Sequence, residues 1–141
     1  MLKKENIIRF IVTNSNHILI ECEINHVSGI FLVDTGASNS CINSKLTTKF
    51  NLDFEISKEK ASSASSQINK TYYSKNNILK IGSYEESNFD LVLFDMTFIN
   101  NSLKEKGLSE VDGIIGGDIL NQLNASINYK KKEIILEFQC T

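Results

Sequence analysis

The 141-residue sequence contains no proline and no tryptophan, and it has only two histidines and three cysteines. These few histidines and cysteines form no metal-ligand spacing, so we expect no metal and no cofactor. The odd number of cysteines (Cys22, Cys41 and Cys140) argues against a fully paired disulfide framework and slightly favours a reducing compartment. The absence of proline leaves the edges of any β-sheet open to further strand pairing.

Long apolar runs and an excess of one charge are also missing. No stretch reaches the length of a transmembrane helix, and residues 1–14 lack the apolar core and cleavage site of a secretory signal. Fifteen Lys and Arg against seventeen Asp and Glu give a net charge of -2, and the basic residues are scattered. Partners such as nucleic acid or a membrane are therefore not expected. A cytoplasmic location is slightly favoured, and an exported protein with its signal removed is the alternative.

The length fits a single domain over residues 1–141 with a core of its own. Two short helices are expected, one at residues 45–50 capped by Ser44 and one at residues 117–123 with Asp118 near its start. The basic cluster at residues 130–132 is typical of an exposed turn between two strands. Apolar or alternating segments predict strands at residues 7–13, 18–24, 30–33, 41–42, 54–57, 68–73, 77–82, 88–96, 113–116, 127–129 and 134–138. The predicted fold class is therefore mostly β.

Two segments interrupt this pattern of strands. Residues 61–67, ASSASSQ, are the only low-complexity stretch, and predicted strands lie on both sides of it. A projecting hairpin with a mobile tip is one interpretation, and a plain flexible linker is an equal alternative on composition alone. Residues 100–111 form a polar insert to which no helix or strand is assigned.

The segment FLVDTGAS places a carboxylate, Asp34, at the point where an apolar strand enters a tight turn. Asp-Thr-Gly alone occurs by chance in roughly a few per cent of chains of this length. Here the triplet follows an apolar strand, and a second motif, GIIG at residues 113–116, occurs about eighty residues later, before a predicted helix. Coincidence is then improbable, and a role for Asp34 as a simple turn cap is the minor alternative.

The motifs FLVDTGAS, ASSASSQ and GIIGGDIL resemble those of the single-lobed, retropepsin-like aspartic proteases, and the resemblance extends over residues 7–138. It implies a small closed β-barrel-like fold and an aspartic endopeptidase that is active as a homodimer. It further implies that Asp34 is the catalytic carboxylate, that Thr35 cross-links the two active-site loops, and that Gly36 admits the substrate backbone. Ile115 and Gly116 are then expected to pack behind the loop.

The same resemblance implies an extended peptide or protein substrate, bound by main-chain hydrogen bonds and by pockets for alternate side chains. The expected apolar pocket residues are Leu32, Cys41 and Ile114. Further contacts are expected from the active-site loop and from the tip of a flap, namely Gly36, Ala37, Ser38, Ser63, Ala64, Ser65 and Ser66.

The sequence departs from the viral members of this family at two positions. Ser38 and Gly117 stand where those enzymes commonly carry an Asp and an Arg that form an ion pair. We expect hydrogen bonds from Ser38 and Asp118 to hold the loop instead. Asp112 and Asp118 lack the turn pattern of a second catalytic motif and are interpreted as structural.

A single Asp-Thr-Gly per chain explains why a homodimer is expected. Peptide hydrolysis without a covalent intermediate needs one group that accepts a proton from water and another that donates one. Two neighbouring carboxylates that share a proton supply both groups, and a two-fold dimer brings two copies of Asp34 together. The terminal strands at residues 7–12 and 134–138 are candidate dimer contacts. The alternative function is a dimerisation or peptide-binding module with weak or no catalysis.

Overall fold

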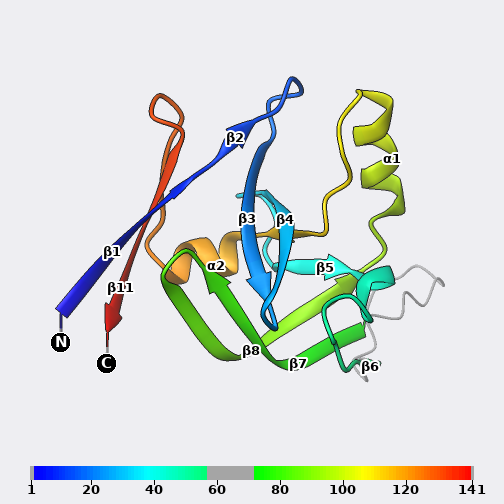
Figure 1. The fold of residues 1–141 in the computed structure, drawn as a ribbon, viewed down its shortest axis with the longest axis horizontal. Coiled ribbons are helices and arrows are strands. Elements are labelled where there is room, and N and C mark those ends of the chain that lie inside the picture. Colours follow the sequence, from blue (N-terminus) through cyan, green and yellow to red (C-terminus); the bar gives the residue numbers. More distant parts are fainter. Residues whose placement is uncertain (1, 57–71, 141) are drawn as a thin grey trace, which may run out of the picture.

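The computed structural model of the protein describes residues 2–56 and 72–140 (Figure 1). The expected flap tip, Ser63 to Ser66, lies outside these residues. The strands are β1 (Leu2–Arg9), β2 (Ile11–Val12), β3 (Ile18–Ile24), β4 (Val27–Val33), β5 (Cys41–Asn43), β6 (Glu55–Ile56), β7 (Tyr72–Ile81), β8 (Tyr84–Phe94), β9 (Gly113–Ile115), β10 (Ser126–Asn128) and β11 (Glu133–Cys140). The helices are α1 (Thr97–Glu105) and α2 (Gly117–Gln122), with one 3₁₀ turn, η1 (Ser44–Leu46).

Six of the strands form a closed barrel. They follow one another in the order β3, β4, β9, β5, β8 and β7, and a second pairing of β3 with β7 closes the ring. The short strands β2 and β6 extend the sheet beyond this ring. The predicted class, mostly β with a small closed barrel, is therefore confirmed.

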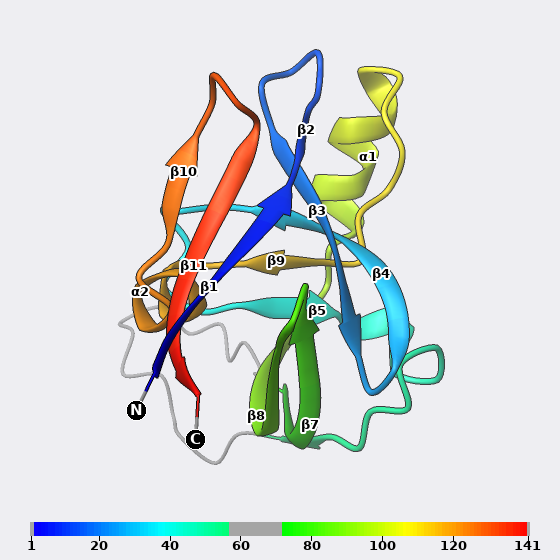
Figure 2. The ribbon, with the colours of Figure 1, turned by 60° about the vertical axis from the view of Figure 1, so that its left-hand side comes forward.

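The two ends of the chain form a separate three-stranded sheet with the order β1, β11, β10 (Figure 2). β1 pairs with β11 over its whole length, from Leu2 opposite Cys140 to Arg9 opposite Glu133, so the termini lie side by side. β10 pairs with the other side of β11 at its first residues. β11 is thus a central strand there, which makes the predicted strand at residues 134–138 a poor candidate for pairing with another chain.

Three adjacent strands, β4, β9 and β5, divide the hydrophobic core into two clusters. Alternate side chains of a strand point to opposite faces, so Phe31 and Val33 of β4 join the larger cluster whereas Leu32 joins the smaller one. The smaller cluster also contains Cys41, Met96, Leu103, Val111 and Ile114. Because the same strands contribute to both clusters, the two clusters are mechanically connected.

No helix or strand was predicted at residues 100–111. This prediction is wrong, because the first half of the insert belongs to helix α1. Asp95 precedes the helix and accepts the backbone N–H of Thr97 at 2.9 Å and its hydroxyl at 2.6 Å. Met96 and Leu103 are buried, with Ile99 packed against them, and this spacing is typical of one helical face. The helix covers the smaller cluster.

The helix predicted at residues 45–50 is also wrong, because only the single turn η1 forms there. Asn43, not Ser44, provides the cap, since its side chain accepts the backbone N–H of Lys45 at 3.2 Å. The predicted strands at residues 68–73 and 77–82 belong, within the described residues, to one strand, β7, which carries an irregularity beside Asn76 (φ 61°). The turn predicted at residues 130–132 is present between β10 and β11.

Candidate active site

Asp34 lies at the end of β4, where the chain enters the loop of residues 34–40. Its backbone N–H donates to the carbonyl of Ile115 at 3.0 Å, and its carbonyl accepts the N–H of Ala37 at 3.2 Å. Its carboxylate oxygen Oδ1 accepts the N–H of Gly36 at 2.9 Å. Asp34, Thr35, Gly36 and Ser38 are all exposed. The loop therefore presents a carboxylate to solvent in an orientation that hydrogen bonds define.

The strand arrangement explains why this loop and the GIIG motif meet. β9 lies between β4, with which it pairs in parallel, and β5, with which it pairs antiparallel. The chain leaves β4 at residue 34 and enters β5 on the other side of β9. A Cβ atom at Gly113 would collide with the carbonyl oxygen of Cys41, and one at Gly116 would lie 2.6 Å from that of Ala37. Both glycines are required by close backbone approach. Ile115, which accepts the backbone N–H of Asp34, and Gly116, which lies against the carbonyl of Ala37, were both expected to pack behind the loop.

A buried serine, Ser40, fastens the far end of the loop to helix α2. Its N–H lies 3.0 and 2.9 Å from the two carboxylate oxygens of Asp118, and its hydroxyl donates to Oδ1 of Asp118 at 2.6 Å. The same hydroxyl accepts the N–H of Gly116 at 2.8 Å. The expectation that Asp118 holds the loop agrees with these contacts. Its partner is Ser40, however, and not Ser38, whose side chain faces solvent.

Asp112 has contacts that fit the structural role predicted for it. Its Oδ2 accepts the backbone N–H of Ile30 at 2.9 Å, and its Oδ1 forms an ion pair with Lys49 at 3.2 Å. Its backbone N–H donates to the carbonyl of Ile30, and its backbone carbonyl accepts the N–H of Asn43. Asp112, which directly precedes β9, therefore ties this strand to the end of β5 and to β4.

The three expected pocket residues, Leu32, Cys41 and Ile114, lie together but are 8%, 6% and 7% exposed. They belong to the cluster under α1 and contact its buried side chains. Burial raises the pKa of the Cys41 thiol to about 11, with a smaller contribution from the nearby carboxylates. The thiol is therefore protonated near neutral pH, and Cys41 behaves as a small hydrophobic side chain.

A hollow of about 270 Å³ lies beside the Asp34 loop and was not foreseen from the sequence. Its lining consists of Thr35, Gly117, Leu120, Asn121, Asn124 and Ala125. None of these side chains is charged. The only sequence signal is that no charged residue occurs between Asp118 and Lys130.

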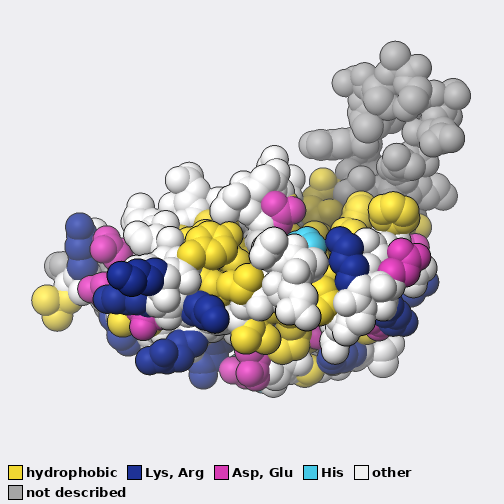
Figure 3. Space-filling view, turned by 90° about the horizontal axis from the view of Figure 1, so that it is seen from above, with side chains coloured by type: hydrophobic (Ala, Val, Ile, Leu, Met, Phe, Trp, Pro, Cys, Tyr) yellow, Lys and Arg dark blue, Asp and Glu magenta, His cyan; other side chains and the backbone are white. Residues whose placement is uncertain are grey.

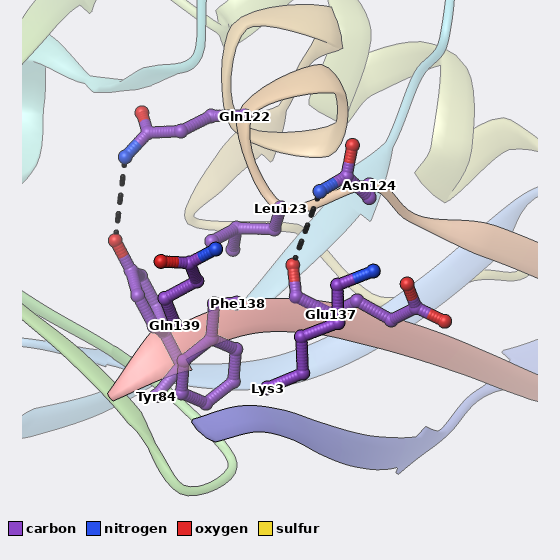
Figure 4. Close-up of a pocket in the computed structure, with 8 residues that line it drawn as sticks. All are labelled: Lys3, Tyr84, Gln122, Leu123, Asn124, Glu137, Phe138 and Gln139. Atoms are coloured by element: carbon purple, nitrogen blue, oxygen red, sulfur yellow. Dashed lines mark hydrogen bonds between the residues drawn. The ribbon is translucent and has the colours of Figure 1, made fainter. Parts of the chain in front are cut away.

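Asn124 also borders a second hollow, of about 300 Å³, between α2 and β11 (Figure 4). Phe138 and Tyr84 pack edge to face there with ring centroids 4.8 Å apart. Burial and a hydrogen bond to Glu86 raise the pKa of Tyr84 to about 12. The phenol is therefore protonated near neutral pH, and the lining combines amides and an aromatic wall with the charged residues Lys3 and Glu137.

One face of the molecule shows how charged side chains of the described residues are distributed. On the face shown in Figure 3, acidic and basic side chains are interspersed around an apolar centre. Among residues 2–56 and 72–140, no group of three or more His, Cys, Asp or Glu side chains has the arrangement of a metal site. Within the same residues, no helix has the length and apolar character needed to span a membrane.

Known proteins share the fold of this chain. A family model described as aspartyl protease matches residues 20–119, and no curated protein sequence matches the chain. A retropepsin-like aspartic protease from Rickettsia conorii superimposes with a TM-score of 0.63 at 20% identity, covering 97% of this chain and 92% of that one. EIAV protease, complexed with the inhibitor HBY-793, gives 0.55 at 16% identity, covering 84% and 99%. The fold is therefore retropepsin-like.

Proposed function

This chain belongs to the aspartyl protease family, and on that premise we propose that it is an aspartic endopeptidase, active as a homodimer with one Asp34 carboxylate from each subunit. The observation that carries the proposal is the exposed carboxylate of Asp34, oriented by the N–H of Gly36 at 2.9 Å. The loop that holds it is fixed to β9 through Ile115 and to α2 through Ser40. A single domain over residues 1–141 carries the site.

In the proposed reaction, the two Asp34 carboxylates share one proton. The ionised carboxylate takes a proton from water, whose oxygen attacks the peptide carbonyl carbon, while the protonated carboxyl donates its proton to the carbonyl oxygen. The C–N bond of the resulting tetrahedral intermediate then breaks. The leaving nitrogen receives a proton from the carboxyl that took it from water, while the other carboxylate removes a proton from a hydroxyl of the intermediate, so that the product is a carboxylic acid and the pair is again singly protonated.

We propose that the loop residues Gly36, Ala37 and Ser38 contact the backbone of an extended peptide. Gly36 and Ser38 are exposed and Ala37 is half-buried, so they are accessible to a substrate. Thr35 borders the hollow next to α2, and we propose that it contacts a second subunit. Leu32, Cys41 and Ile114 stay predictions for apolar pockets.

The proposed activity is tested by incubating the protein with an unstructured peptide mixture from mildly acidic to neutral pH and identifying products by mass spectrometry. We expect discrete cleavages that disappear in Asp34→Asn. Asp53→Asn is the matched control, because it removes an exposed carboxylate that lies before β6. Cleavage that persists in Asp34→Asn contradicts the proposal. Absence of cleavage by protein shown to be dimeric favours the binding module.

The sharing of one site by two subunits is tested by subunit mixing. When wild type is mixed with an equal amount of Asp34→Asn and subunits exchange randomly, about a quarter of the dimers carry two intact carboxylates. The cleavage rate should then fall to about half that of the wild type alone. An equal addition of Asp53→Asn should raise the rate instead. A rate that is unaffected by Asp34→Asn would indicate that each subunit acts alone.

A further inference from the structure

A third hollow, of about 420 Å³, lies at the opposite end of β4 from Asp34. Three segments enclose it, namely the turn between β3 and β4 at Asn25, the segment that leads into β6, and β7 at residues 75–77. Asn25 precedes β4 and Asp34 follows it, so the length of this strand, roughly 20 Å, separates the two sites. Figure 2 shows the turn between β3 and β4 at the end of β4 that lies away from α2. We call this site the amide hollow.

The base of the amide hollow is held by a network of side-chain amides. The amide nitrogen of Asn25 donates to the carbonyl of Phe50 and to Oδ1 of Asn77, both at 2.9 Å. Oδ1 of Asn25 accepts the backbone N–H of Ile78 at 2.9 Å. Asn77, which is 3% exposed, donates in turn to the hydroxyl of Ser74 at 3.0 Å. Because these bonds join the three segments, the amide hollow is formed before any ligand binds.

The backbone explains why a hollow forms between β6 and β7. The two strands pair over only two residues each. On either side of the hollow, Asn51 and Asn76 have positive φ angles of 53° and 61°. This left-handed conformation turns each segment away from an extended path, and asparagine tolerates it better than most residues do. The two segments therefore separate next to the short pairing and leave space between them.

Amides and one aromatic ring are available to a ligand in the amide hollow. Asn51 and Asn76 both line it, and neither side-chain amide forms a hydrogen bond within residues 2–56 and 72–140. Each of these amides has both donors and an acceptor, so it can bond the carbonyl and the N–H of a peptide unit. Phe54 also lines the hollow, and 54% of it is exposed. Its ring offers contact area to an apolar side chain.

Charges of both signs also line the amide hollow. Glu55 comes from β6 and Lys75 from β7, and both are exposed. No ion pair joins them to each other or to another described residue. A ligand with one ammonium and one carboxylate group therefore finds an opposite charge for each end, and such complementarity selects and orients a ligand.

We propose that the amide hollow binds short peptides with free termini, of about the size of a dipeptide. The ammonium group of the peptide lies toward Glu55 and its carboxylate toward Lys75. Asn51 and Asn76 bond the peptide unit, and Phe54 contacts an apolar side chain. Such peptides are end products of the proposed endopeptidase, and this link rests on the proposed function, whereas the binding itself does not.

Binding is tested by NMR titration of isotope-labelled Asp34→Asn, which the proposed mechanism leaves unable to cleave peptides. The probes are the dipeptide alanylphenylalanine, its N-acetyl form and its C-terminal amide, so that each blocked form lacks one terminal charge. We expect the free dipeptide to shift the amide signals of Asn51 and Asn76. Because exposed charge pairs contribute little, blocking either terminus should weaken binding by about threefold.

Variants of Asp34→Asn assign each part of the ligand to its partner. Lys75→Met should make the affinities of the free dipeptide and of its amide equal, while N-acetylation still weakens binding. Lys80→Met is the matched control, because Lys80 is exposed on the same strand and does not line the hollow. Phe54→Ala should weaken binding more than Phe98→Ala, which removes an exposed ring on α1.

Several outcomes would overturn the amide hollow as a peptide site. These are equal affinities for the three probes, signal shifts confined to the Asp34 loop, and equal effects of Lys75→Met and Lys80→Met. If wild type cleaves peptides but binds no dipeptide, the inference is wrong and the proposed function stands. Dipeptide binding by a wild type that lacks cleavage activity supports the amide hollow and removes the proposed function.

Discussion

Ser40 determines how the Asp34 loop is held, through one buried hydroxyl that donates to Asp118 and accepts from the N–H of Gly116. Ser40→Ala leaves that N–H without its acceptor, and an unmet buried polar group costs about 1–3 kcal/mol. We expect the free energy of unfolding to fall by about 2 kcal/mol and the peptide cleavage rate to fall with it. Urea denaturation and the peptide assay measure the two effects.

Ser38→Ala is the matched control for this change, because Ser38 lies in the same loop and is exposed. It should alter the free energy of unfolding by less than about 0.5 kcal/mol. Ser40→Thr, which keeps the hydroxyl, should retain more stability than Ser40→Ala. Equal losses in Ser38→Ala and Ser40→Ala would contradict the role given to the Ser40 hydroxyl.

The Cys41 thiol provides a second prediction, for the dependence of stability on pH. Burial raises its pKa from 9.0 to about 11 in the folded protein, so between these values the folded state keeps a proton that the unfolded chain has lost. The stability from this group is full below pH 9.0 and is lost as the pH rises through 11. In Cys41→Ala, the free energy of unfolding should fall less steeply across this interval. Identical slopes in variant and wild type would contradict the shift.

At the scale of elements, the strength of the local pattern decided what could be predicted. The strands β4 and β9 could be predicted because, in each, a continuous run of apolar residues is followed directly by turn-forming residues. Helix α1 was missed because Met96, Ile99 and Leu103 alternate with polar residues that include Asn100 and Asn101. Its apolar face is narrow, and the strands that it covers come from distant parts of the sequence.

One buried amide joins α1 to the segment before β9 and gives a prediction for the helix. Oδ1 of Asn100 accepts the N–H of Val111 at 2.9 Å, and its Nδ2 donates to the carbonyl of the same residue at 3.2 Å. Asn100→Ala leaves both buried backbone groups without these partners, so the free energy of unfolding should fall by about 2–3 kcal/mol. Asn101→Ala, at the exposed neighbouring position, should change it by less than about 0.5 kcal/mol. Chemical denaturation of both variants measures the two changes in the free energy of unfolding.

At the scale of the whole molecule, the sequence predicted the two motifs that meet but not the contacts that fasten them. The loop of Asp34 and the GIIG motif were expected to be adjacent, and β4 and β9 place them so. The pairing of Ser40 with Asp118 spans 78 positions of sequence, and no local pattern selects Ser40 over Ser38. The burial of Leu32 and Cys41 under α1 likewise depends on a helix that pattern reasoning did not assign.

The division of the core by β4, β9 and β5 leads to a prediction for the whole chain as one domain. Leu103 of α1 is 4% exposed and lies in the smaller cluster, so Leu103→Ala should cost about 2–5 kcal/mol. Because the same three strands line both clusters, the loss should shift the unfolding of the entire chain. Two tryptophan reporters can follow it, Phe98→Trp on α1 and Tyr129→Trp beside β10, since the chain has no tryptophan of its own.

Both sites are exposed, at 85% and 60%, so the reporters themselves should cost little. At one protein concentration, each reporter should give the same denaturation midpoint, and Leu103→Ala should lower both by the same amount. If Leu103→Ala lowers the midpoint reported by Phe98→Trp but not the midpoint reported by Tyr129→Trp, then α1 and its cluster unfold separately from the terminal sheet. The Asp34 loop, which connects β4 and β5, would then lose its support at the α1 side before the terminal sheet opens.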